Sequence, residues 1–292
     1  MKKLLLAILF VLSFSGCSNE KAVDVSKHLY KVERNGQYLY LLGTIEVGKE
    51  FDKVDNDTKK AYQDSQMIVT DISLDYLNKN HYLHKEPIKD VCQQDSLNQL
   101  MKNINHYQTN LVYFNAKKMS GYNPVAISST LQLAIFQELG YSSEYGIDSY
   151  FIRMGKEDRK KFDELETLNI QEDMILDISR KFGDHILMQA ANYNENKKEQ
   201  KELTDIYYRG TRKKINEYYN QLDLKKTELN DEQKQDYQNI MINNKNKKII
   251  KKIEDYLNTD EVEFVILNAK YVHGKNGIVS LLKQQGYKVA NY

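Results

Sequence analysis

Two segments near opposite ends of the chain resemble each other, and this internal repeat constrains the fold more than any other feature of the sequence. Residues 40–48, Tyr-Leu-Leu-Gly-Thr-Ile-Glu-Val-Gly, align with residues 265–272, Val-Ile-Leu-Asn-Ala-Lys-Tyr-Val, and His273-Gly274 follow one residue later. Each copy is read as a strand, a short elbow, a helix and a strand. We therefore expect an α/β fold whose mixed central sheet is built from both ends of the chain. The elbows should meet at one crevice, at the carboxyl ends of neighbouring strands.

The other local patterns add elements to this sheet and place a helical insertion between the two repeats. Asn35-Gly36, between two β-rich runs, predicts a hairpin. Apolar runs predict a strand at 67–69 that ends near Asp71, a short strand at 162–165 and a terminal strand at 287–289. Helical spacing covers 96–139, 170–219 with a break near Gly183, 231–257 and 277–285. The helical insertion spans roughly residues 90–260.

The N-terminal segment has the pattern of an export signal. Two lysines precede an apolar run at residues 4–14, which is too short to span a membrane and has the length of a signal-peptide core. Small residues lead directly to Cys17, as in the bacterial lipoprotein box, in which the cysteine carries the lipid. We expect a signal peptide at 1–16, a tether at 17–28 and a domain at 29–292, anchored by Cys17 outside the cytoplasm. An ordinary secretory signal with an incidental Cys17 is the alternative.

The balance of charges and the number of cysteines exclude two classes of protein. The chain has 42 Lys and Arg against 41 Asp and Glu, so charge predicts no affinity for nucleic acid. It has two cysteines, which excludes a disulfide framework. If Cys17 carries lipid, Cys92 has no partner and is expected to be a lone structural thiol.

Several sequence blocks, in order, resemble those of the TraB/PrgY/GumN family, relatives of the Tiki metallopeptidases whose hallmark is two G-x-x-H elbows. The first block is Leu-Leu-Gly-Thr-Ile-Glu-Val-Gly at 41–48, and Ile-Val-Thr-Asp at 68–71 stands at the acidic strand. Gly-Ile-Asp-Ser-Tyr-Phe at 146–151 resembles G-I-D-x-x-F, and Leu-Glu-Thr at 165–167 with Gln171 resembles L-E-T-x-x-x-Q. Residues 264–289 resemble the final strand, elbow, helix and strand. The resemblance implies a core of the erythromycin-esterase/ChaN-like type, with metal-dependent hydrolysis in some members and control of peptide pheromones proposed for others.

The departures from this pattern fall on the residues that matter most for metal chemistry. Glu46 stands at the first histidine position, and Asn268 and Tyr271 replace the glycine and histidine of the second elbow. Lys245 stands where arginine is usual, and lysine lacks the bidentate fork of arginine. The chain is therefore expected to be a divergent member. Its other family-matched positions are Gly43, Asp148 and Glu166.

The resemblance makes Glu46 and Glu166 the candidate catalytic residues. Glu46, Asp71 and Glu166, with Tyr271 or His273, are the candidate metal ligands, and an oxygen-rich set favours Mn, Mg or Ca over Zn. Each has a simpler interpretation. Glu46 can point into solvent, Glu166 and Asp71 can cap the next turn, and His273 is expected to be an exposed loop residue.

Two further patterns are given structural interpretations. His81 and His84 form an H-x-x-H without an acidic residue between them, which is weak as a zinc signal. A lysine-rich run is expected to be a solvated helix face, with contact to an anionic membrane as a lesser alternative. This run contains Lys245, Lys247, Lys248, Lys251 and Lys252.

Three functions remain open at the level of sequence. The preferred hypothesis is a lipoprotein that binds a peptide or a surface protein and has lost or weakened metallohydrolase activity. The second is an active metal-dependent peptidase with a rebuilt shell of Glu46, Asp71 and Glu166. The third is a haem- or iron-binding lipoprotein with Tyr271 or His273 as axial ligand.

Overall fold

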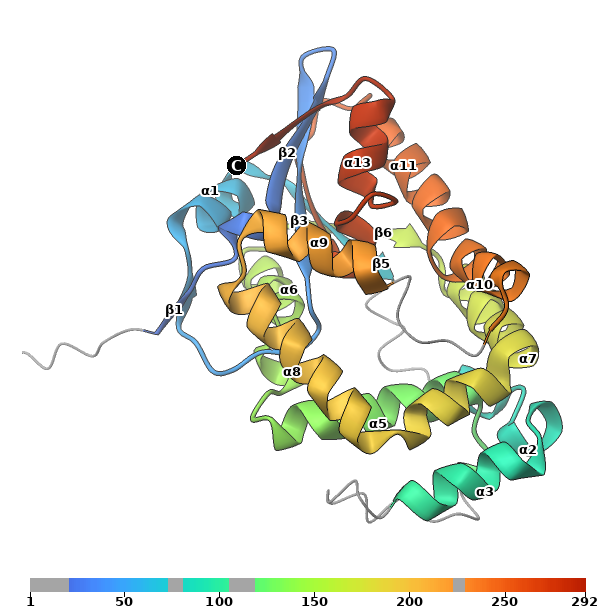
Figure 1. Cartoon of the computed structure of the whole chain (residues 1–292). Coiled ribbons are helices and arrows are strands. Elements are labelled where there is room, and N and C mark those ends of the chain that lie inside the picture. The colour runs from blue at the N-terminus through green and yellow to red at the C-terminus, as the bar shows by residue number, and fades with distance from the viewer. Residues whose placement is uncertain (1–20, 73–80, 105–118, 223–228) are drawn as a thin grey trace, which may run out of the picture.

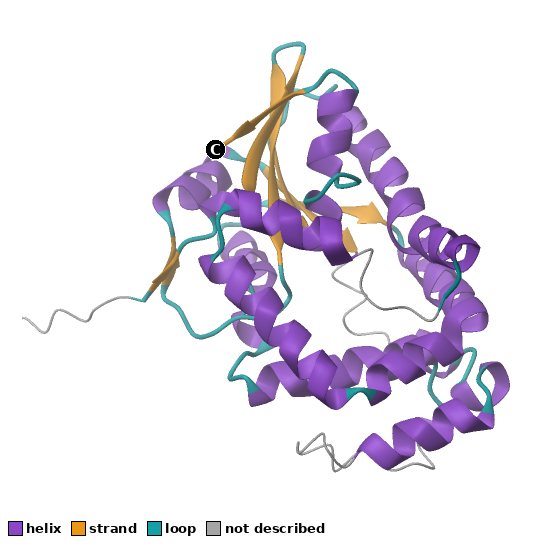
Figure 2. Ribbon diagram, in the orientation of Figure 1, coloured by secondary structure: helices purple, strands orange, loops and turns teal. Residues whose placement is uncertain are grey.

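The fold is a mixed α/β arrangement around a six-stranded sheet, as expected. The structure is a computed structural model that describes residues 21–72, 81–104, 119–222 and 229–292. The strand order is β6-β5-β7-β3-β2-β8, and helices lie on both faces of this sheet (Figures 1 and 2). Its strands are β2 (Leu29–Arg34), β3 (Gln37–Thr44), β5 (Met67–Ile72), β6 (Lys161–Glu166), β7 (Glu263–Asn268) and β8 (Lys288–Asn291).

The antiparallel side of the sheet begins with the predicted hairpin. β2 pairs with β3 from Leu29 opposite Leu42 to Arg34 opposite Gln37. The two residues of the turn, Asn35 and Gly36, have φ values of 54° and 87°. Positive φ at both turn residues is the geometry that an Asn-Gly hairpin requires. β8 pairs with the outer side of β2 and brings the C-terminus to this edge.

The two repeats predicted from sequence lie side by side in the sheet. β3 and β7 are parallel neighbours, and Thr44 lies opposite Asn268. β5 is parallel to β7 on its other side, and β6 is parallel to β5. Four strands from distant parts of the chain therefore run in the same direction and end at the same edge of the sheet.

Each face of the sheet has its own apolar core. Tyr40 and Leu42 face one side with Ile68 and Phe264, and this layer is covered by α1 (Asn56–Asp64), α6 (Ile147–Glu157), α8 (Tyr193–Arg209) and α9 (Arg212–Leu222). Leu39 and Leu41 face the other side, which is covered by α11 (Asn244–Tyr256) and α13 (Ile278–Gln284). Alternate residues of β3 thus enter opposite cores, as the pleat of a strand dictates.

A further group of helices packs on itself, with a separate apolar core (Figure 1). α5 (Pro124–Glu138) begins with Pro124 at its first turn and is capped by the side chain of Asn123. α7 (Leu168–Ala191) packs against α5 and is kinked at Phe182, next to the predicted break at Gly183. The short helices α2 (Ile88–Val91) and α3 (Gln94–Asn103) contact α7. The helical insertion predicted at roughly residues 90–260 is interrupted by β6, which is an edge strand of the sheet.

The segment predicted as one long helix at 231–257 consists of three joined parts. α10 (Asp231–Gln238) has a full capping box of Asn230 and Gln233 at its start. A π-helical turn follows at Asn239–Asn243, and α11 continues from it. A π-turn shifts the phase of a helix, so it changes which side chains of α11 face the sheet.

Residues 21–28 were expected to be part of the tether, but the structure places them against the domain. β1 (Ala22–Val23) pairs with β4 (Lys53–Val54), and η1 (Ser26–His28) leads directly into β2. The backbone N–H of Val25 donates to the side chain of Asp55. Asp55 also accepts from the Thr58 N–H and so caps the start of α1, a role for which Asn56 and Asp57 have equally suitable side chains.

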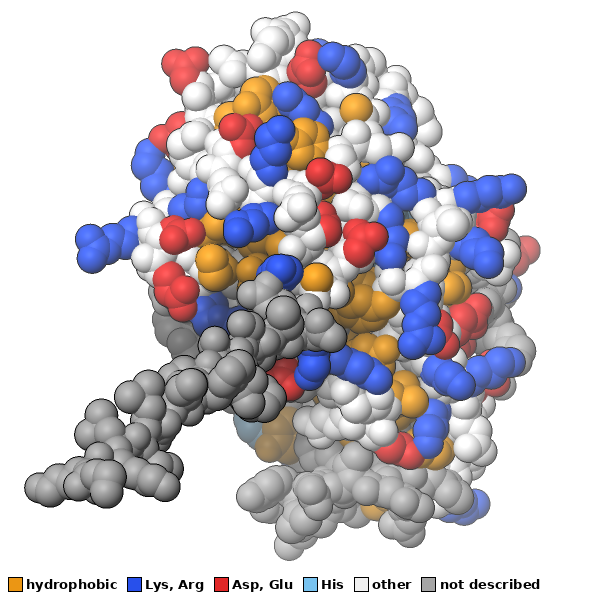
Figure 3. Space-filling view, turned by 90° about the vertical axis from the view of Figure 1, so that its left-hand side faces the viewer, with side chains coloured by type: hydrophobic (Ala, Val, Ile, Leu, Met, Phe, Trp, Pro, Cys, Tyr) orange, Lys and Arg blue, Asp and Glu red, His pale blue; other side chains and the backbone are white. Residues whose placement is uncertain are grey.

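No helix in the described part of the chain is long and apolar enough to cross a membrane. Lysine, arginine and carboxylate side chains alternate over the face shown in Figure 3. That face therefore presents no extended field of one sign.

Candidate functional site

Polar side chains gather where the four parallel strands end. Thr44 ends β3, Asp71 is the next-to-last residue of β5, Glu166 ends β6 and Asn268 ends β7. Side chains from the following elements join them, and the whole set is called the carboxyl-end cluster here. Its members are Thr44, Glu46, Asp71, Asp148, Glu166, Lys245, Asn268, Lys270 and Tyr271.

A buried lysine joins two of the predicted metal ligands. The Lys245 ammonium lies 2.7 Å from Asp71 Oδ1 and 3.0 Å from Glu166 Oε2. The side chains of Lys245 and Glu166 are only 2% and 3% exposed, whereas that of Asp71 is 26% exposed. Burial alone would lower the pKa of Lys245, but the attraction of Asp71 and Glu166 outweighs it and raises the pKa. Lys245 is therefore a resident cation of the site.

The prediction that Lys245 belongs to a solvated helix face is wrong. Lys245 shares its side of α11 with Ile249 and Ile253, which are four and eight residues later and point into the core. The neighbouring Asn246 is also buried, and its amide donates to the carbonyl of Asn276. The other lysines of the run lie on the outer side of α11 and are exposed or half-buried.

Tyr271, at the second histidine position of the family pattern, lies close to two ammonium groups. It is 3% exposed and comes from the short helix α12 (Ala269–Val272). Lys245 Nζ is 4.6 Å from the centroid of its ring and Lys270 Nζ is 4.8 Å away. The ring face attracts both cations. Two positive charges beside Tyr271 oppose the approach of a third cation.

Asn268 replaces the glycine of the second elbow and has a structural role. Its side-chain oxygen accepts from the backbone N–H of Lys270, 3.1 Å away, and caps α12. Its amide nitrogen lies 3.4 Å from Glu46 Oε1. Glu46 itself is exposed, so the first elbow presents a carboxylate to solvent beside the second elbow.

Asp148, at the start of α6, is a half-buried carboxyl group of the cluster. Its Oδ1 accepts a hydrogen bond from the Thr44 hydroxyl, whereas its Oδ2 is buried and has no partner among the described residues. Burial raises the pKa of Asp148 to about 7, the charges of Glu46 and Asp71 add to the rise, and the Thr44 hydrogen bond opposes it. Two backbone hydrogen bonds between Gly48 and Ser142 hold the first elbow against the loop that precedes this helix.

His273 does not belong to the cluster, and the prediction that it is an exposed loop residue is wrong. It is 3% exposed, with Nε2 2.9 Å from His28 Nδ1 and Nδ1 3.2 Å from the Tyr30 hydroxyl. His28 Nε2 in turn lies 2.9 Å from the Tyr207 carbonyl. Burial lowers the pKa of His28 to about 3 and that of His273 well below its usual value.

This histidine pair lies against the first elbow. A side chain at Gly43 would place its Cβ 3.1 Å from His273 Nε2, so the close approach depends on glycine. Both ring nitrogens of His273 already have partners, so the geometry gives no support to His273 as a metal or haem ligand. No group of three or more His, Cys, Asp or Glu in the described ranges has the geometry of a metal site.

The remaining predicted positions lie elsewhere. His84 contacts the carbonyl of Gly121 and the ring of Tyr122 in the helical part of the molecule, and the side chain of His81 is outside the described residues. Cys17 is outside them as well. Cys92 is a free, half-buried thiol, and burial raises its pKa to about 12, as befits a structural cysteine.

Sequence reasoning did not single out Thr44, His28 or Lys270. Thr44 and Lys270 are part of the two elbows, so the repeat itself was a signal for them. His28 has no such signal, because its partner His273 is 245 residues away.

A mixed sheet with helices on both faces, and a polar cluster at the carboxyl ends of its parallel strands, defines an α/β protein with its candidate site at that edge. The model of the TraB/PrgY/gumN family matches residues 28–291, nearly the whole chain, and the chain belongs to this family. Searches of curated proteins and of solved structures found no match.

Proposed function

We propose that this TraB/PrgY/gumN protein binds a peptide or a surface protein at the carboxyl-end cluster, and that its metallohydrolase activity is lost or weakened. We further propose that acylated Cys17 anchors it to the outer side of the bacterial cell membrane. Family membership supports the first proposal, and the small residues before Cys17 support the second.

The observation that carries the loss of metal chemistry is the position of Lys245. Its ammonium already pairs with Asp71 and Glu166, two of the three carboxylates expected to hold a metal. A divalent ion would have to displace a buried ammonium or accept its repulsion at short distance. Both histidine positions are also occupied by other residues, Glu46 and Tyr271. Neutral imidazoles bind a metal without cancelling its charge, whereas a carboxylate such as Glu46 in place of an imidazole makes bound water less acidic.

One observation favours the second candidate function, an active peptidase with a rebuilt oxygen shell. Glu46 is exposed, and one oxygen of Asp148 has no partner among the described residues, so neither of these carboxyl groups pairs with Lys245 there. An ion held by them would be Mn, Mg or Ca before Zn. The haem hypothesis has no comparable support, since Tyr271 lies close to two ammonium groups.

Metal analysis of the purified protein tests the proposal. Less than one tenth of an equivalent of Mn, Mg, Ca or Zn is expected, as a rough bound, after equilibration with each ion and desalting. Lys245→Met should increase Mn²⁺ binding, because it removes the resident cation, whereas Lys248→Met on the exposed side of α11 should not. One equivalent of metal in the wild-type protein, together with chelator-sensitive peptide cleavage, would contradict the proposal.

A further inference from the structure

One buried acceptor oxygen of the carboxyl-end cluster, Asp148 Oδ2, has no hydrogen-bond partner among the described residues. Burial of such an oxygen costs free energy unless a donor reaches it. The Glu46 carboxylate lies 3.4 Å from the amide nitrogen of Asn268, and its charge also attracts the Lys270 ammonium. Glu46 comes from the first elbow and Asp148 from the start of α6, and the charge of Glu46 is close enough to raise the pKa of Asp148.

The cations of the site do not supply the missing donor. Lys245 is held between Asp71 and Glu166. Lys270 lies over the Tyr271 ring, and among the described residues no ion pair joins it to Glu46 or Asp148. The cluster thus has a buried acceptor without a donor among the described residues, Asp148 Oδ2, and an exposed carboxylate, Glu46, for which these residues supply no close ion pair.

We propose that Asp148 and Glu46 bind the ammonium group of a peptide, either its free N-terminus or a lysine side chain. This inference rests on the proposed peptide-binding function and specifies the chemistry by which the peptide is recognised. An ammonium group has three N–H donors, so a single group can donate to more than one carboxyl oxygen.

An ammonium group differs from a metal ion in the ligands that it needs. The repulsion from Lys245 and Lys270 and the attraction of the carboxylates are both half as large for one positive charge as for two at the same distance, so the difference lies in the geometry of the donors. An ammonium group also needs no histidine ligand and no fixed coordination geometry. The same residues that weaken metal binding therefore leave room for an amine.

A positive charge beside Asp148 would favour its ionised form, which is the stronger hydrogen-bond acceptor. Groups that face Asp148 from the packed elements are Thr44, Glu46, Asp71, Tyr207 and Tyr208.

The test uses the mature protein, purified in detergent with its anchor, and three probes in calorimetric or NMR titrations. The probes are triglycine amide with a free amino terminus, its N-acetylated form, and N-acetyl-lysine amide. We expect the first or third probe to bind and the acetylated triglycine not to bind. Binding of the first alone identifies an N-terminus as the source of the ammonium, and binding of the third alone identifies a lysine.

Variants assign the binding to these two residues. Asp148→Asn keeps the size of the side chain, and Glu46→Gln changes an exposed residue that the fold does not need. Each should weaken amine binding by about tenfold or more, the usual effect of losing a charged hydrogen bond. Glu50→Gln, an exposed glutamate paired with Lys21, is the matched control and should leave binding unchanged.

The proposal is overturned if no amine probe binds, if the acetylated triglycine binds as well as the free one, or if both variants keep the wild-type affinity. These results are distinguishable from failure of the proposed function. That failure would appear as stoichiometric Mn²⁺ binding and chelator-sensitive peptide cleavage, whether or not an amine binds.

Discussion

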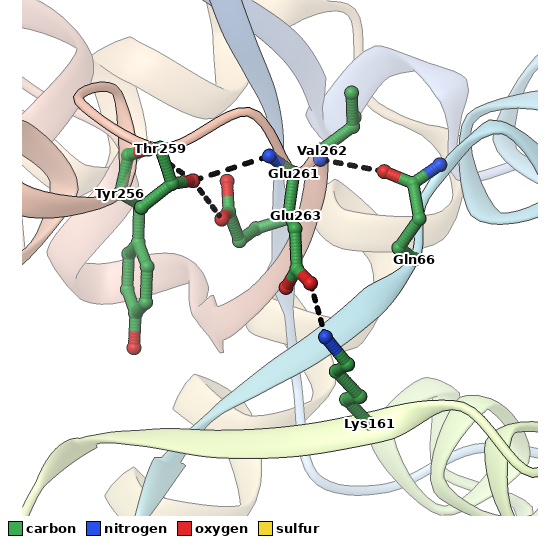
Figure 4. A network of polar contacts seen from close by, with 7 residues as sticks. All are labelled: Gln66, Lys161, Tyr256, Thr259, Glu261, Val262 and Glu263. Atoms are coloured by element: carbon green, nitrogen blue, oxygen red, sulfur yellow. Dashed lines mark hydrogen bonds and ion pairs between the residues drawn. The ribbon is translucent and has the colours of Figure 1, made fainter.

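Glu263 offers a quantitative test of the electrostatics of this fold, at the end of the sheet opposite the candidate site. It begins β7 and is 1% exposed, with one oxygen 3.2 Å from the Thr259 hydroxyl and the other buried without a hydrogen-bond partner among the described residues. Figure 4 shows Thr259 between Glu263 and the backbone of Glu261, and Lys161 reaching Glu261 instead. Burial raises the pKa of Glu263 from 4.5 to about 7.

The sign and size of the effect follow from this pKa. The folded protein binds the proton more tightly than the unfolded chain, so the contribution of Glu263 to stability is largest at low pH and is lost as pH rises through about 7. The full change would correspond to roughly 2.5 kcal/mol between about pH 5 and about pH 8. Because this strand end lies near solvent, screening should reduce the change to about 1–2 kcal/mol.

Glu263→Gln removes the ionisation and keeps the shape. Urea unfolding at about pH 5 and about pH 8 should show that the variant gains about 1–2 kcal/mol relative to wild type as pH rises. The control is Glu261→Gln, which breaks an ion pair with Lys161 at the surface and should cost about 0–1 kcal/mol at both pH values. If the difference between Glu263→Gln and wild type does not change with pH, the folded-state pKa of Glu263 is not raised and the reasoning fails.

Three more predictions concern the site, the histidine pair and the anchor. Lys245→Met should lower the free energy of unfolding by about 3–5 kcal/mol, because it leaves Glu166 buried and unpaired. The control, Lys248→Met, should change it by less than about 0.5 kcal/mol. Equal effects of the two variants in chemical denaturation would contradict the buried ion pair. Neutral His28 contributes its full stability above its unfolded pKa of about 6.5, and this contribution is lost by about 1.4 kcal/mol per pH unit as pH falls toward 3. His28→Gln should therefore make the urea midpoint less dependent on pH in the acid range. An unchanged pH dependence would refute this reasoning. Cys17→Ser should release the protein from membranes in cell fractionation, and a variant that stays membrane-bound would disprove the anchor.

The sheet could be predicted from sequence because its signals are local. The Asn35-Gly36 turn fixes the hairpin, and the apolar runs of β3 and β7 are long enough to identify buried parallel strands. Their place as neighbours came from the repeat. The register differs from the sequence alignment by one residue, since Leu42 lies opposite Ile266 and not Leu267.

The interior of the candidate site could be predicted only in part. Glu166 and Asp71 were placed correctly at the ends of their strands, but Lys245 was assigned to solvent because lysine is rarely buried without partners. Its spacing to Ile249 and Ile253 contained the signal, and its partners lie in strands far away in the sequence. The same distance in sequence hid the contact of His273 with His28 and of Asp148 with Thr44.

If Cys17 carries a lipid anchor, the contact of Lys21 with the domain limits how far the domain can lie from the membrane. Lys21 donates its backbone N–H to Asp52, and only residues 18–20 separate it from Cys17. If Cys17 is acylated, the four peptide units between these residues span at most about 14 Å, which is shorter than the roughly 18 Å radius of gyration of a domain of this size. The domain would then lie against the lipid headgroups, because the linker is too short to let it move away from them. A partner would have to reach this thin layer next to the bilayer, so diffusion along the membrane becomes its natural route to the site.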